Sequence, residues 1–138
     1  MAWTTINYTC GHSVEVQMYG PHAERDRRAE AKGKSDCPDC RAKGSDLTGS
    51  AKQIAWAIDI RATALPKAEA AHAEWTAKLA ASAAPEMARV HVQAALDAKI
   101  AEIRARSAAR DWIDHQQPEL EVYEAMRLAM TEAKKLAR

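Results

Sequence analysis

The sequence predicts a mainly α-helical protein with a small β module at its N-terminus, of the zinc-ribbon or treble-clef kind, followed by a helical bundle or helical hairpin. Three observations support this fold class. All three cysteines lie in the first 40 residues, β-rich runs flank the first of them, and the later chain is rich in alanine with apolar residues at helical spacing. We therefore expect a zinc-binding hairpin and knuckle module in residues 1–48 and an alanine-rich helical region in 49–138.

The N-terminal module is predicted from two short pairs of metal-binding residues, Cys10 with His12 and Cys37 with Cys40. Thiolates and imidazole favour zinc over magnesium or calcium, and residues two or three positions apart can bind one ion together. We expect one structural Zn²⁺ held by all four residues. His22, which follows Gly-Pro, is an alternative to His12, although the Cys-x-His spacing favours His12.

Other uses of the cysteines fit less well. A Cys-x-x-Cys redox pair is expected near a βαβ pattern, which this sequence lacks. Three cysteines cannot all form disulfides within the chain, and the helical region is long enough to form a core without them. A reducing compartment follows from this interpretation.

The first metal-binding pair lies between two runs that alternate in character, Trp3–Thr9 and Ser13–Tyr19. Such alternation is typical of strands, so we expect a β-hairpin with the knuckle at its tip. Gly11 provides the backbone freedom that this turn requires. A short helix near 22–32 should link the two pairs.

Prolines and one cap predict the helices that follow. Pro66, Pro85 and Pro118 each precede a charged, alanine-rich run, and proline is best tolerated in the first turn of a helix. Ser50 and Gln53 match a capping box. The expected helices span about 51–65, 67–82, 86–115 and 119–137.

Each of these segments carries apolar residues three and four positions apart, as in the Val92, Leu96, Ile100 and Ile103 series. Alanines between the larger side chains allow helices to approach closely. A compact antiparallel bundle or an extended hairpin is the expected result.

Charge and hydropathy exclude several classes of protein. The formal charge of +1 becomes about 0 if three thiolates bind one Zn²⁺ (+1 − 3 + 2 = 0), so no strong basic field attracts nucleic acid. The N-terminal residues lack the features of a signal peptide, and no uncharged stretch is long enough to span a bilayer. We expect a cytoplasmic protein without membrane contact.

Two segments resemble a known group of proteins. Residues 47–61 match the pattern Leu-x-Gly-Ser-x-Lys-Gln-Ile-x-Trp-Ala-x-x-Ile-Arg, and residues 109–114 match Ala-x-x-Trp-Ile-Asp. These patterns resemble small uncharacterised bacterial and phage-encoded proteins, some with an N-terminal zinc-binding segment. The resemblance implies a non-enzymatic accessory protein carried by a mobile element, and it transfers no catalytic residue.

The candidate functional residues of the helical region are Trp56, Arg61 and Trp112. Either Trp56 and Trp112 are core anchors and Arg61 is solvated or paired, or the three residues form an exposed Trp/Arg surface of the kind that dominates protein interfaces. The sequence contains no phosphate loop, nucleophile elbow or helical zinc-protease motif.

The predicted function is therefore binding to a protein partner without catalysis. One form of it is a mobile-element-encoded inhibitor of a host defence complex, similar in role to an anti-CRISPR protein. The alternative is a nucleic-acid-binding zinc ribbon with an accessory or regulatory role, since arginines cluster at residues 25–28 and 104–110. Homo-oligomerisation stays open.

Overall fold

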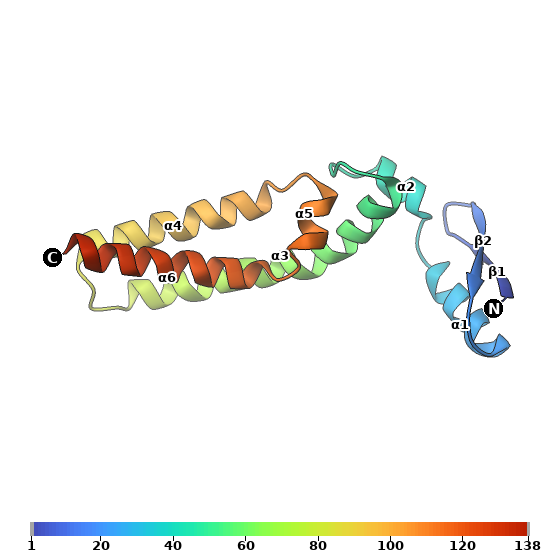
Figure 1. Cartoon of the computed structure of the whole chain (residues 1–138), viewed down its shortest axis with the longest axis horizontal. Helices are drawn as coiled ribbons and strands as arrows, with labels where there is room; N and C mark the ends of the chain where they lie inside the picture. Colours follow the sequence, from blue (N-terminus) through green and yellow to red (C-terminus); the bar gives the residue numbers. More distant parts are fainter. Residues whose placement is uncertain (1, 138) are drawn as a thin grey trace.

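The computed structural model describes residues 2–137, so Met1 and Arg138, the ends of the two predicted regions, lie outside the described residues. The molecule is elongated, with a small β-containing head at the N-terminal end and a helical bundle that reaches the C-terminus at the other (Figure 1). The prediction of a mainly helical protein with a small N-terminal β unit is confirmed. The head contains β1 (Ala2–Asn7), β2 (Ser13–Met18) and α1 (His22–Lys32), and α2 (Pro38–Lys43) follows it.

The head is a β-hairpin covered by one helix. Strands β1 and β2 pair antiparallel, with Thr5 opposite Glu15, and they form a two-stranded sheet. Helix α1 packs against β1 and completes a small core of Ile6, Met18 and Ala29. Gly11, in the turn between the strands, has a φ of 88°, a left-handed conformation that glycine adopts without strain.

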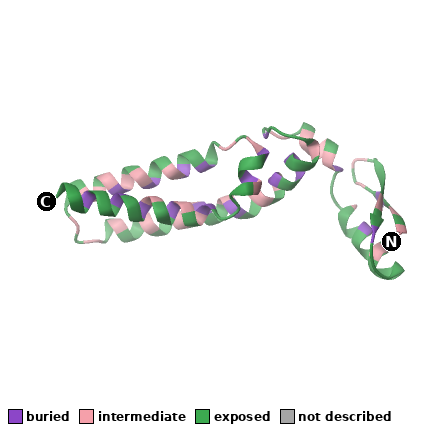
Figure 2. Ribbon diagram, in the orientation of Figure 1, coloured by how far each residue is buried: buried purple, intermediate pink, exposed green. Residues whose placement is uncertain are grey.

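The bundle consists of three long helices that pack against one another: α3 (Ala51–Ala80), α4 (Glu86–Arg104) and α6 (Pro118–Leu136). Its buried residues form a stripe along the inward side of each helix (Figure 2). Helix α3 contributes mostly small side chains, whereas α4 and α6 contribute Leu96, Ile103, Val122 and other large ones. The alanines therefore bring the helices together, as the sequence predicted.

Helix α3 begins at the predicted cap and then continues past the predicted break. Ser50 and Gln53 form the capping box through two reciprocal bonds of 3.2 Å. The expectation that Pro66 starts a new helix is wrong, since α3 runs through it without interruption. Ala64 and Ala68, on either side of Pro66, are both buried in the core. Their packing offsets the backbone hydrogen bond that the proline removes.

The single helix predicted over 86–115 is also wrong. Helix α4 ends at Arg104, and a short helix α5 (Ala109–Asp114) follows after a turn. Two backbone hydrogen bonds hold this turn to the segment just before α3. The Thr48 N–H donates to the Ser107 carbonyl at 2.8 Å, and the Ala109 N–H donates to the Thr48 carbonyl at 2.8 Å. This connection redirects the chain so that α5 packs against α3.

Helix α2 connects the head to the bundle. It packs on α3, where the Arg41 guanidinium bonds the Asp59 carboxylate, and Ala42 lies against the bundle core. Within residues 2–137, no helix of the bundle makes extensive contact with β1, β2 or α1. Leu47 is already part of the bundle core, so the region division at residue 48 stays a prediction. None of the helices described has both the length and the apolar character that crossing a membrane requires.

Candidate metal centre

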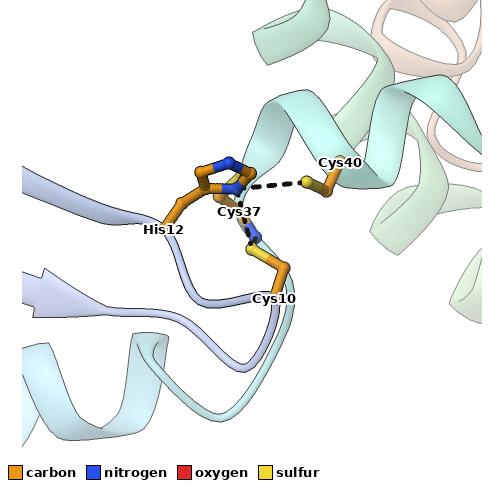
Figure 3. A group of neighbouring side chains, drawn as sticks. All are labelled: Cys10, His12, Cys37 and Cys40. Atoms are coloured by element: carbon orange, nitrogen blue, oxygen red, sulfur yellow. Dashed lines mark hydrogen bonds between the residues drawn. The ribbon is translucent and has the colours of Figure 1, made fainter.

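The four residues predicted as metal ligands come together in the structure. One potential ligand atom from each of Cys10, His12, Cys37 and Cys40 lies within 4.8 Å of every other (Figure 3). His22 is not in this group, because it starts α1 and pairs with the Asp26 carboxylate at 2.9 Å. The alternative ligand set with His22 therefore does not match the structure.

Two separate parts of the chain supply the ligands. Cys10 and His12 lie in the turn between β1 and β2, while Cys37 is the residue that caps α2 and Cys40 lies in its first turn. Pro38 occupies the first helical position, where its missing N–H costs nothing. Proline at this point starts the helix directly at the Cys-x-x-Cys pair and so orients both thiols to one side.

Hydrogen bonds outside the ligand set hold the two parts in register. The Thr9 hydroxyl donates to the Asp36 carboxylate at 2.6 Å, and the Thr9 N–H donates to the Ser35 carbonyl at 3.2 Å. The turn itself is closed by the Tyr8 N–H, which donates to the His12 carbonyl at 2.9 Å. The ligands are thus positioned by backbone and side-chain bonds as well as by any ion.

The distances fit a tetrahedral ion. His12 Nδ1 lies 3.4 Å from Cys10 Sγ, 3.6 Å from Cys37 Sγ and 3.3 Å from Cys40 Sγ. Zinc bonds of about 2.3 Å to sulfur and about 2.05 Å to nitrogen, at the tetrahedral angle, place N and S about 3.6 Å apart. The four side chains are therefore spaced as ligands of one small ion. The coordinating nitrogen would be Nδ1, with the Nε2 proton facing outward.

The backbone prepares one thiol for a cation. The Cys37 N–H points at Cys10 Sγ at 3.3 Å, and this hydrogen bond is the largest cause that lowers the pKa of Cys10 from 9.0 to about 6. At neutral pH Cys10 is thus mainly thiolate. Cys40 shows the opposite effect, because a hydrogen bond with the Cys37 side chain, burial and the nearby Cys10 raise its pKa to about 11.

A cation changes this balance. Three crowded thiols cannot all ionise together without one, since each thiolate raises the pKa of its neighbours. An ion at the centre favours all three thiolates and the neutral imidazole. If an ion bound all four protein atoms, the tetrahedron would be complete and would leave no position for substrate or water. Such a closed arrangement is typical of structural sites, and an ion here would join the hairpin turn to α2.

The three candidate partner-binding residues lie in different environments. Trp56 is 54% exposed on α3. The Arg61 side chain is 27% exposed and bonds both oxygens of the Asp46 carboxylate, at 3.0 and 3.2 Å. Trp112 is 0% exposed in the bundle core, and its indole N–H donates to the Arg106 carbonyl at 3.2 Å. We therefore remove Trp112 from the predicted partner surface, because a buried side chain cannot touch a partner.

Two features of the site were not predicted from sequence. One is the hydrogen bond from the Cys37 N–H to Cys10 Sγ, which depends on the fold and leaves no sequence signal. The other is the pair of ion pairs, Arg41 with Asp59 and Arg61 with Asp46, that ties the metal-proximal segment to α3. Arg61 is a specified position of the family-like pattern, whereas Asp59 is an unspecified one, so the pattern gives no signal for the Arg41–Asp59 pair.

Comparisons with protein-family models, with curated protein sequences and with solved structures found no match to this chain.

Proposed function

We propose that Cys10, His12, Cys37 and Cys40 hold one structural Zn²⁺. The support is chemical and geometric: three thiolates and an imidazole suit zinc, and the Nδ1–Sγ distances of 3.3, 3.4 and 3.6 Å are close to those of a tetrahedral zinc centre. Elemental analysis of protein purified without chelator should give one zinc per chain. Replacement of zinc by Co²⁺ should produce the visible spectrum of tetrahedral thiolate coordination. Protein that contains no metal, or a Co²⁺ spectrum typical of octahedral oxygen ligands, would contradict the assignment.

We further propose that the chain is a non-enzymatic binding protein that acts on a protein partner through the bundle surface around Trp56. A half-exposed tryptophan is the observation that carries this proposal. It borders an open hollow of about 420 Å³ between α3 and the connection from α5 to α6, lined also by Ile60, Lys67 and Gln117. A large aromatic side chain beside a hollow with a mixed apolar and polar lining is typical of interface hot spots.

The resemblance of residues 47–61 to phage-encoded proteins favours a partner in the bacterial host, such as a defence complex that an anti-CRISPR-like inhibitor would block. Trp56 and Arg61 both lie in that segment. Arg61 supports the surface indirectly, because its ion pair with Asp46 holds the segment before α3 in place. This more specific role is a proposal that rests on the resemblance.

The test is capture of partners from bacterial lysate with tagged full-length protein, treated or not with nuclease. Protein partners should be retained after nuclease treatment and should be lost with Trp56→Ala. The control is Met87→Ala, which removes an even more exposed apolar side chain at the far end of the bundle, on α4. Partners that disappear with nuclease would favour the nucleic-acid-binding alternative, and partners retained equally by both variants would exclude the Trp56 surface.

A further inference from the structure

The outer edge of β1 has unpaired backbone groups. In an antiparallel ladder, alternate residues exchange both hydrogen bonds with the partner strand, and the residues between them direct N–H and C=O outward. The Tyr8 N–H donates to the His12 carbonyl, so the same register places Trp3 and Thr5 among the outward residues. Within the described chain, no hydrogen bond is made to the backbone of either residue. Such an edge is a template for another strand.

Helix α1 turns this edge into a groove. An open hollow of about 760 Å³ lies between β1 and α1, lined on the strand by Trp3 and Thr5 and on the helix by Arg25 and Ala29. One end is closed, because Gly33 at the end of α1 abuts the Asn7 carbonyl so closely that an added Cβ would lie 2.4 Å from the oxygen. A strand-and-helix groove of this kind is how several domain families bind extended peptides.

Arg25 gives the groove a chemical preference. Its Nε is buried and has no hydrogen-bond partner within residues 2–137. Asp26, the adjacent acid, is already paired with His22. Glu30 also lines the groove, but no ion pair joins it to Arg25. Nε itself is closed to solvent, but Arg25 is partly exposed and lines the groove, so the outer part of its guanidinium is where a carboxylate from outside the chain would bind.

We propose that an extended segment of a partner protein adds to β1 as a third strand in this groove and places an Asp or Glu side chain against Arg25. The main-chain groups of Trp3 and Thr5 supply the strand pairing, and Trp3, 66% exposed beside them, covers the added strand. The inference rests on the proposed function, in that the chain acts by binding protein. It uses a different surface from the one around Trp56.

The experiment selects peptides from a displayed library of random decapeptides on the zinc-loaded full-length protein, and then measures their affinity for variants. Thr5→Pro removes the outward N–H from the β1 edge without breaking the ladder, since proline is tolerated at an edge strand. The matched control is Glu15→Pro, because Glu15 lies opposite Thr5 and directs its own N–H to the other edge of the sheet. Arg25→Gln tests the carboxylate, with the exposed Arg27→Gln as its control. Zinc content and circular dichroism verify the fold of each variant.

Selected peptides should contain a carboxylate, and both Thr5→Pro and Arg25→Gln should weaken their binding at least tenfold, while both controls bind as wild type. Hydrogen exchange at the Trp3 and Thr5 amides should slow when peptide is added. Three results would overturn the proposal: no enriched peptide, equal binding by all variants, or dimerisation of the free protein that Thr5→Pro abolishes, which would make a second copy the occupant. The proposal would also fail if the protein bound a single-stranded oligonucleotide but no peptide, and if Arg25→Gln abolished that oligonucleotide binding. If selected peptides bind the head while lysate yields no partner that depends on Trp56, the proposal for the bundle surface fails and this one stands.

Discussion

At the scale of single residues, the two family-like tryptophans have different roles. Trp112 fills the core of the bundle and Trp56 lies on its surface. Replacing Trp112 by alanine should lower the free energy of unfolding by about 3–5 kcal/mol, because it leaves a large cavity and removes the hydrogen bond to the Arg106 carbonyl. Trp56→Ala should lower the free energy of unfolding much less, because the side chain is half exposed. Urea denaturation monitored by circular dichroism measures both values, and equal losses would contradict the burial difference.

The ion pair between Arg61 and Asp46 predicts a pH dependence. The hydrogen bond from the Arg61 guanidinium holds the pKa of Asp46 below its usual value of 3.8. A lowered pKa in the folded state means that the pair stabilises the fold above the pKa of an unfolded aspartate, and this contribution is lost as pH falls through the folded value. Since the carboxylate is well exposed, the effect on stability is small.

Arg61→Gln should therefore raise the pKa of the Asp46 carboxyl, as measured by an NMR titration of the side-chain carboxyl carbons. Arg110→Gln is a suitable control, because Arg110 pairs with Asp114 and makes no bond to Asp46. An unchanged Asp46 pKa in the Arg61 variant would show that the pair does not persist in solution. Arg61→Glu is a poor probe of binding, since it would place two carboxylates together at the start of the bundle.

At the scale of elements, Pro66 lies inside α3 and not at the start of a helix as predicted. Proline in a helix interior costs about 3 kcal/mol relative to alanine, but it also restricts the unfolded chain. Pro66→Ala should restore the hydrogen bond to the Ala62 carbonyl and raise the free energy of unfolding by about 1–2 kcal/mol. Thermal or urea denaturation measures this change. A destabilised variant would indicate that the restriction proline places on the unfolded chain outweighs the missing hydrogen bond.

The elements that could be predicted are those whose signals are local. The Ser50 capping box and Pro118 mark true helix starts, and the alternation around Cys10 marks the hairpin. Pro66 and the end of α4 could not be predicted, because tertiary contacts decide both: the packing of Ala64 and Ala68, and the pairing of Thr48 with the turn at Ala108. The same division applies to the metal centre. Spacing indicated the four candidate ligands, but only the fold shows that Nδ1 of His12 faces the three thiols and that the Cys37 N–H bonds Cys10.

The helical region should fold without the head. Residues 47–138 contain the α3 cap and nearly the whole bundle core, and within the described residues β1, β2 and α1 make no extensive contact with the helices of the bundle. A fragment that begins at Leu47 should give a helical circular-dichroism spectrum and a cooperative unfolding transition. The full-length protein is the control. A disordered spectrum would show that the head and bundle form one cooperative unit, against the division into regions predicted at residue 48.

At the scale of the whole molecule, the metal centre should organise the head and leave the bundle unaffected. Cys37→Ser tests this cleanly, because serine is a good helix cap and preserves the start of α2 while it removes a ligand. Amide exchange should increase through residues 1–48, where binding free energy is largely folding free energy, and should change little in the bundle. If amide exchange in the head were unchanged in Cys37→Ser, the small core of Ile6, Met18 and Ala29 would be enough to keep the head folded without the metal.

The position of the metal centre between the head and α2 has a consequence for avidity. Trp56 lies in the second turn of α3, and α2 packs on α3, so the two proposed contact surfaces would keep a fixed separation as long as an ion holds the hairpin turn to α2. A partner bound at one surface then presents its second contact at a fixed distance and with a high effective concentration. Loss of the proposed Zn²⁺ would weaken the connection between the hairpin turn and α2, so the segment between α1 and α2 would act as a more flexible tether. The head and the bundle would each keep whatever affinity they have alone, but the gain from simultaneous engagement would fall. Chelation would then weaken a bivalent complex more than either isolated contact.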